Sequence, residues 1–70
     1  MKIKYDPQAD VLMLVLRDAL PADSVEEPGG VIVSYGKDGI PVSVEFLKAS
    51  EKKLIVPGQA SVPIQTAPAT

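Results

Sequence analysis

Six consecutive apolar residues, Val11 to Leu16, restrict the fold of this chain more than any other stretch. Their valine content and the turn-forming residues on either side favour a strand, although a run of six is also compatible with a buried helix segment. In a strand, successive side chains point to opposite faces, so both faces of this segment are apolar. A half-exposed antiparallel sheet carries one polar face instead. We therefore expect this strand to be covered on both sides.

The chain has limited means of supplying both covers. It has 70 residues, no Cys and no His, so disulfides are impossible and a zinc-type site lacks its usual ligands. At this size one core barely offsets the entropy of ordering the chain, and oligomerisation is the remaining means of stabilisation. We expect a homo-oligomer, with a dimer as the first hypothesis. Its predicted interface consists of Val11, Leu12, Met13, Leu14, Val15 and Leu16. The alternative is that the chain's own C-terminal part covers both faces.

Two hairpin patterns are visible in the sequence. Lys2–Tyr5 alternates polar and apolar residues, and the turn-forming Asp6–Ala9 joins it to the apolar run. An Asp38-Gly39 turn joins two further predicted strands, Val31–Tyr35 and Val42–Leu47. The sequence therefore predicts a mainly β fold, an antiparallel four-stranded meander of two hairpins, with a small α+β fold as the variant.

The remaining segments are less regular. Ala19–Glu27 contains Pro, Asp, Ser and two Glu residues, which predicts a solvated connection. Residues 48–56 predict a short helical turn or a fifth strand. From Leu54 onward the chain has no charged residue and is interrupted by prolines. We expect a single small β domain over residues 1–56 and an extended, Pro-containing tail over residues 57–70, either docked or mobile.

Charge and hydropathy argue against two classes of partner. The net charge is −2 and the pI is about 4.8, whereas nucleic-acid-binding domains carry a basic stripe and a high pI. The apolar run is far shorter than a membrane span, and the first residues do not resemble a signal peptide. We therefore expect a soluble cytoplasmic protein that binds neither nucleic acid nor membrane.

Few residues are suited to catalysis. Without His or Cys there is no Ser-His or Cys-His pair, and no glycine-rich stretch matches a phosphate-binding loop. We expect no catalytic residue, no cofactor and no metal. The weak candidate polar site consists of Tyr5, Asp6 and Asp10, whose two carboxylates flank the first turn as acid–base chemistry would require. Turn capping is the simpler explanation of the same residues.

The other charged residues have simple explanations in terms of solvation. An acidic patch consists of Asp23, Glu26 and Glu27. Its oxygen ligands suit a hard cation, but the spacing of an EF-hand is absent and a solvated loop is the simpler explanation. Lys2 and Lys4 are typical of an edge strand that is protected by charge. Arg17, the only arginine, is expected to end the second strand in solvent.

Four short motifs follow one another in a distinctive order. They are Tyr5-Asp6-x-x-x-Asp10, Glu26-Glu27-Pro28-Gly29, Asp38-Gly39 and Glu45-x-Leu47-x-Ala49-Ser50. Together they resemble a small bacterial family of uncharacterised proteins, the domain of unknown function 2283. The resemblance covers about the first fifty residues and implies a small antiparallel β protein without an established activity. Relatives suspected to lie beside toxin-like genes also imply an antitoxin-type role.

Three functions follow as hypotheses. The first is a small non-enzymatic β protein that self-assembles and binds another protein. The second, based on the acidic loop and the low pI, is an antitoxin-like partner of a small basic toxin. The third is a carboxylate-dependent or divalent-ion-dependent enzyme that uses Asp6, Asp10 and Tyr5.

Overall fold

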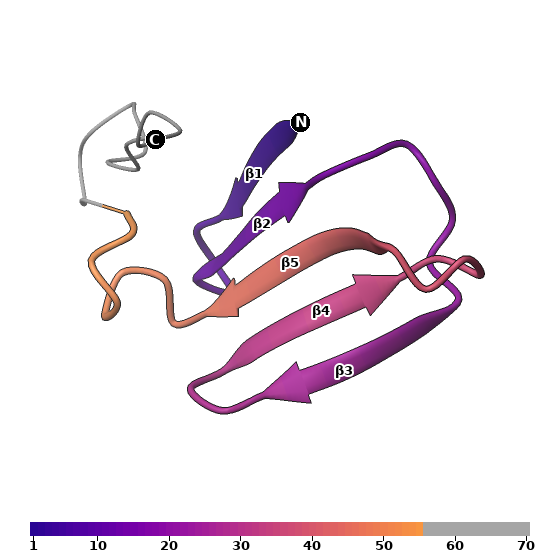
Figure 1. Cartoon of the computed structure of the whole chain (residues 1–70). Coiled ribbons are helices and arrows are strands. Elements are labelled where there is room, and N and C mark those ends of the chain that lie inside the picture. The colour runs from indigo at the N-terminus through magenta and orange to yellow at the C-terminus, as the bar shows by residue number, and fades with distance from the viewer. Residues whose placement is uncertain (56–70) are drawn as a thin grey trace, which may run out of the picture.

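The computed structural model describes residues 1–55, which form five strands and no helix (Figure 1). The strands are β1 (Lys2–Asp6), β2 (Val11–Val15), β3 (Asp23–Glu27), β4 (Val31–Tyr35) and β5 (Pro41–Leu47). The predicted mainly β fold is confirmed. The predicted tail over residues 57–70 lies outside the described residues, so the division into a domain and a tail stays a prediction.

All five strands belong to one antiparallel sheet with the order β1-β2-β5-β4-β3. Both predicted hairpins are confirmed, β1 with β2 and β4 with β5. The strand order differs from that of the predicted meander, because β2 pairs with β5 and not with the strand that follows it in the chain. Figure 1 shows β5 in the middle of the sheet. This arrangement gives β2 a neighbour on each side, which satisfies its backbone groups along both edges.

β3 lies in the segment that the sequence predicts to be a solvated connection, and that prediction is wrong for Asp23–Glu27. The segment pairs residue for residue with β4, from Asp23 opposite Tyr35 to Glu27 opposite Val31. Its side chains are all exposed, because β3 is an edge strand with no neighbour on its outer side. Its polar composition reflects this exposure, whereas backbone pairing with β4 holds it in the sheet.

Of the two structures predicted near residues 48–56, the fifth strand does not occur among residues 48–55, and the short helical turn is present as one hydrogen-bonded turn. Residues 48–55 form neither a helix nor a strand but turns and a bend. The Lys52 N–H donates to the Lys48 carbonyl (3.2 Å), which is the spacing of a single helical turn. Lys48 and Lys53 have φ values of 53° and 61°. Because these values are left-handed, neither a right-handed helix nor a strand can continue through those positions.

Few side chains among residues 1–55 are buried. The buried hydrophobic residues are Leu12, Val42 and Ala49, and the polar Ser43 is buried next to Val42 in the sequence. Most other side chains of β2, β4 and β5 are only half-buried. All five strands lie in one sheet, so no second sheet among residues 1–55 packs on its faces.

Leu12→Ala should lower the free energy of unfolding by about 2–5 kcal/mol, because the fully buried side chain would leave a cavity. Leu20 is 88% exposed, and Leu20→Ala should change stability by at most about 0.5 kcal/mol. Urea unfolding at a fixed protein concentration measures both changes. Equal losses in the two variants would contradict the central position of Leu12 in the core.

Candidate interaction surface

One face of the sheet is almost entirely apolar. Residues paired across antiparallel strands share a face, so the register defines two neighbouring rows that run from β1 to β3. One row consists of Tyr5, Leu12, Phe46, Val31 and Glu27, and the other of Ile3, Leu14, Val44, Val33 and Val25. We call these ten positions the apolar face. Glu27 is its one charged residue and lies on the edge strand β3. Asp23 of β3 and its partner Tyr35 of β4 extend the same face.

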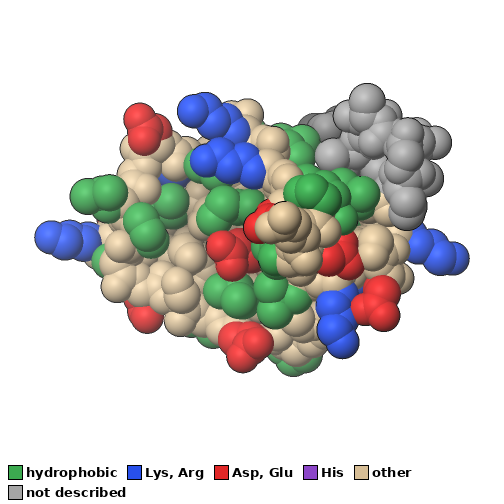
Figure 2. Space-filling model, turned by 180° about the vertical axis from the view of Figure 1, so that it is seen from behind, with side chains coloured by type: hydrophobic (Ala, Val, Ile, Leu, Met, Phe, Trp, Pro, Cys, Tyr) green, Lys and Arg blue, Asp and Glu red, His purple; other side chains and the backbone are tan. Residues whose placement is uncertain are grey.

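The opposite face combines charged, polar and apolar side chains. Its two rows consist of Lys4, Met13, Glu45, Ile32 and Glu26, and of Lys2, Val15, Ser43, Ser34 and Ser24. We call these ten positions the mixed face. Figure 2 views the molecule from behind and shows acidic side chains among hydrophobic ones near the middle of the surface. The two faces therefore differ in chemistry, and only the apolar face has an uncharged centre.

The six predicted interface residues are divided between these faces. Leu12 and Leu14 lie on the apolar face, whereas Met13 and Val15 lie on the mixed face. Val11 pairs with Asp6 and Leu47 at the same side of the sheet as Met13. Leu16 follows the end of β2 and is 39% exposed. Leu12 is the one buried residue of the six, so the other five retain surface that a partner could cover.

A polar cluster joins the β1–β2 turn to the segment after β5. Asp10 has a positive φ of 56°. Its Oδ1 accepts hydrogen bonds from the Tyr5 hydroxyl (2.7 Å) and the Ser50 N–H (3.0 Å). Its Oδ2 accepts a third from the Ser50 hydroxyl (2.6 Å), and its carbonyl accepts one from the Ala49 N–H (3.0 Å). Asp10 thus connects two segments that are 40 positions apart in the chain.

These hydrogen bonds reinforce the ordinary protonation states of Asp10 and Tyr5 near neutral pH. The Ser50 hydroxyl, followed by the Tyr5 hydroxyl, lowers the pKa of the Asp10 carboxyl, because donors stabilise its charged form. The same bond to Asp10 raises the pKa of Tyr5. Asp10 therefore stays ionised and Tyr5 stays protonated, which are the states that the hydrogen bonds require. The carboxylate is occupied by three donors from the chain itself.

Asp6, the third residue of the predicted polar site, does not join this cluster. Its Oδ1 accepts hydrogen bonds from the N–H groups of Gln8 (3.0 Å) and Ala9 (3.3 Å), as in an Asx turn. Within residues 1–55, no hydrogen bond links Asp6 to Asp10. The structure therefore brings Tyr5 and Asp10 together, and adds Ser50 from far along the chain.

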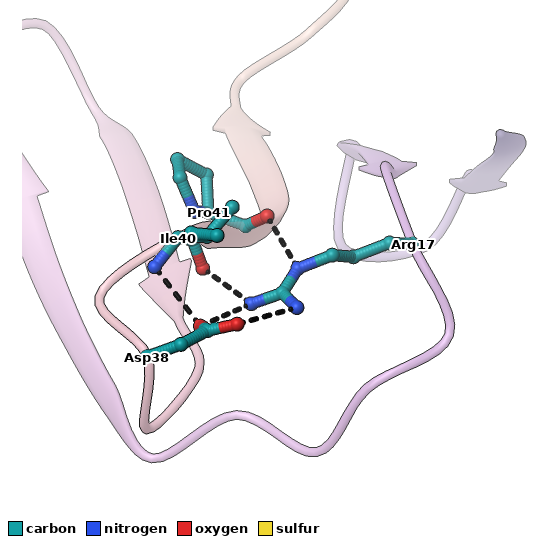
Figure 3. Close-up of polar contacts among 4 residues, drawn as sticks. All are labelled: Arg17, Asp38, Ile40 and Pro41. Carbon is teal, nitrogen blue, oxygen red and sulfur yellow. Dashed lines mark hydrogen bonds and ion pairs between the residues drawn. The ribbon is translucent and has the colours of Figure 1, made fainter.

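Arg17 forms a second polar cluster just after β2 (Figure 3). Its guanidinium donates to both carboxylate oxygens of Asp38 (2.6 and 3.0 Å) and to the carbonyls of Ile40 (2.8 Å) and Pro41 (3.2 Å). The bidentate bond from Arg17, and then the Ile40 N–H, lower the pKa of Asp38. The expectation that Arg17 ends β2 in solvent is wrong, because its side chain is only 33% exposed and binds the β4–β5 turn.

Gly36 leaves the space that this guanidinium occupies. A Cβ at Gly36 would lie 2.6 Å from an Arg17 guanidinium nitrogen and 2.9 Å from Asp38 Oδ1. Four hydrogen bonds hold the guanidinium in place, so a side chain at Gly36 would have to break some of them. Close approach, and not a special φ value, therefore favours glycine at this position.

The two polar clusters lie at opposite ends of the β2–β5 pair. Asp10 precedes β2 and binds Ala49 and Ser50, just after the end of β5. Arg17 follows β2 and binds Ile40 and Pro41, at the start of β5. Both clusters therefore fix the register between β2 and β5.

The described part of the chain contains no group of three or more His, Cys, Asp or Glu side chains placed to hold a metal ion. None of the described residues forms a helix long and apolar enough to cross a membrane.

The family model of DUF2283, described as a protein of unknown function, matches residues 2–50. The chain belongs to the DUF2283 family. The family resemblance predicted from four short motifs is thereby confirmed. Comparison with curated proteins and comparison with solved structures gave no match.

The segment matched by the DUF2283 model includes all five strands and both polar clusters. It ends at Ser50, whose N–H and hydroxyl both bind Asp10. Ser50 was absent from the predicted polar site, although the Ala49-Ser50 motif supported the resemblance. The signal for Ser50 in the sequence was its place in the series of family motifs. Sequence separation alone does not show that a serine 40 positions along the chain reaches Asp10.

The DUF2283 protein should lose stability in acid partly through Asp10. Its pKa is lowered in the folded state, so its contribution is complete above the unfolded-state pKa of roughly 3.9 and is lost as the pH falls through the lowered value. Asp10→Asn should reduce stability near neutral pH and flatten the acid limb of a plot of unfolding free energy against pH. Asp18→Asn, at an exposed carboxyl, is the matched control and should leave that limb unchanged. An acid limb of wild-type steepness in Asp10→Asn would refute the role of Asp10.

Arg17 and Asp38 should be energetically coupled, because the planar guanidinium binds both carboxylate oxygens. Arg17→Lys and Asp38→Asn should each lower the melting temperature, since neither replacement preserves the ionic, two-point geometry. The double variant should lose less than the two single losses added together. Thermal unfolding of the four proteins measures the coupling, and strict additivity would show that the pair contributes nothing.

Proposed function

We propose that this DUF2283 protein is a self-assembling, non-enzymatic β protein, and that its apolar face packs against the same face of a second copy. The composition of the apolar face carries the proposal. Nine of its ten positions are apolar and extend across all five strands, with Glu27 as the exception. Ile3 and Val25, on the two edge strands, are 45% and 40% exposed.

A second copy suits this face for electrostatic and geometric reasons. Its centre has no charge, so two identical faces can meet without repulsion between like charges there. Two sheets that pack face to face lie about 10 Å apart and interdigitate their inner side chains into a common core. A domain normally buries a sheet face against a second layer, and a copy of the same chain would provide that layer. Homodimers also tend to have more apolar interfaces than transient complexes.

The mixed face is less suited to this role. Lys4, Glu45 and Glu26 lie in one of its rows, and burial of these charges against an identical face would cost desolvation energy. Neighbouring residues of β2 therefore distinguish the two possible interfaces. Leu14 lies on the apolar face, and Met13 lies on the mixed face.

Sedimentation velocity of the full chain at micromolar concentration should give a dimer for the wild type. Leu14→Glu should shift the population to monomer, because it places a carboxylate in the proposed interface. Met13→Glu, one residue away on the opposite face, should remain dimeric. Val25→Lys tests the same face on an exposed edge strand, where the change is compatible with folding, and it should also weaken the dimer.

Circular dichroism of each variant provides the folding control. A wild-type chain that is monomeric at micromolar concentration would overturn the proposal. A folded Val25→Lys variant that associates as tightly as the wild type, while Met13→Glu dissociates, would assign the interface to the mixed face and would equally overturn it.

A further inference from the structure

Glu45 is a charged residue at the centre of the mixed face. It lies on β5, the middle strand, between Met13 of β2 and Ile32 of β4. It is half-buried, and its carboxylate forms no ion pair within residues 1–55. Because apolar neighbours reduce the screening of its charge by water, a cation bound here is attracted more strongly than at an open surface.

An open hollow of about 400 Å³ adjoins this carboxylate. Val11 and Met13 contribute apolar surface to it, and its other lining residues besides Glu45 are Lys4, Tyr5, Asp6 and Ala9. Asp6 already accepts two hydrogen bonds from its own turn. Glu45 is therefore the carboxylate of the hollow that has room for a ligand, and the apolar side chains beside it are suited to an aliphatic stem.

An arginine side chain matches both features. Its guanidinium binds a carboxylate through two parallel N–H groups, and its methylene stem packs against apolar surface while the charged end stays hydrated. We propose that this hollow binds an arginine side chain of a partner protein, with the guanidinium on Glu45 and the stem on Met13. Glu45 and Met13, the two residues proposed to contact the arginine, lie on the mixed face, so the proposal does not depend on the dimer.

Lys4 gives the proposal a second, opposite test. It lines the same hollow from the edge strand β1, and its ammonium repels a cationic ligand. Removal of the Glu45 charge should therefore weaken binding, whereas removal of the Lys4 charge should strengthen it. A hollow that bound ligands through apolar contacts alone would show neither effect.

The experiment titrates the full-length, isotope-labelled protein with N-acetylarginine methylamide and follows the backbone amide signals by NMR. We expect saturable shifts around Met13 and Glu45 at millimolar probe concentrations. N-acetylcitrulline methylamide, which has nearly the same shape but no charge, should bind about tenfold more weakly. Glu45→Gln should weaken arginine binding by a similar factor, and Lys4→Ala should tighten it roughly twofold.

Glu26→Gln is the matched control, because Glu26 lies in the same row on the outer strand β3, away from the hollow. This variant should bind the arginine probe as the wild type does. The amide spectrum of each variant without probe shows whether the fold is retained. The comparison of the charged and uncharged probes tests the site in the wild-type protein, where no substitution affects the fold. Absence of saturable shifts, equal binding of the two probes, or unchanged binding in a folded Glu45→Gln variant would each overturn the proposal.

Discussion

The pairing of β2 with β5 holds the two parts of the sheet together. It joins an N-terminal hairpin to the hairpin that β5 forms with β4, and it places Leu12 between Tyr5 and Phe46 in one row. Without this ladder, the β1–β2 hairpin would be separate from the three strands β3, β4 and β5, and an isolated two-stranded hairpin has little stability in water. The two polar clusters stabilise its ends. Asp10 binds Ser50 at one end, and Arg17 binds Ile40 and Pro41 at the other.

This central pairing also determines the chemistry of the two faces. A shift of the register by one residue would move every β2 side chain to the opposite side of the sheet. Leu14 would then leave the row of Val44 and Val33, and Met13 would replace it. The polar clusters hold β2 and β5 in the register that keeps one face apolar and leaves Glu45 on the other. The proposed dimer and the proposed arginine site consequently depend on the same alignment, although they use opposite sides of the sheet.

Much of the local structure could be predicted because it depends on neighbouring residues. Val31–Tyr35 is a strand with the predicted bounds, and the Asp38-Gly39 turn joins it to β5, with Gly39 at a φ of 77°. β3 was missed because four of its five side chains are polar, as an exposed edge strand permits. The candidate polar site was predicted in part. Tyr5 and Asp10 are hydrogen-bonded to each other, as the predicted site requires. Asp6 caps its own turn instead, and the third member of the cluster is Ser50, 40 positions from Asp10.

Local patterns in the chain predict the hairpins, the turns and the need of β2 for apolar neighbours, because alternation, turn chemistry and β-branched residues act over a few positions. Long-range packing determines that β2 pairs with β5, that Asp10 binds Ser50, and that Arg17 binds Asp38 and does not extend into solvent. These choices involve groups 21 to 40 positions apart. Many pairings of strands satisfy the local pattern equally well. The one adopted here aligns the apolar rows and supplies hydrogen-bond partners to both polar clusters.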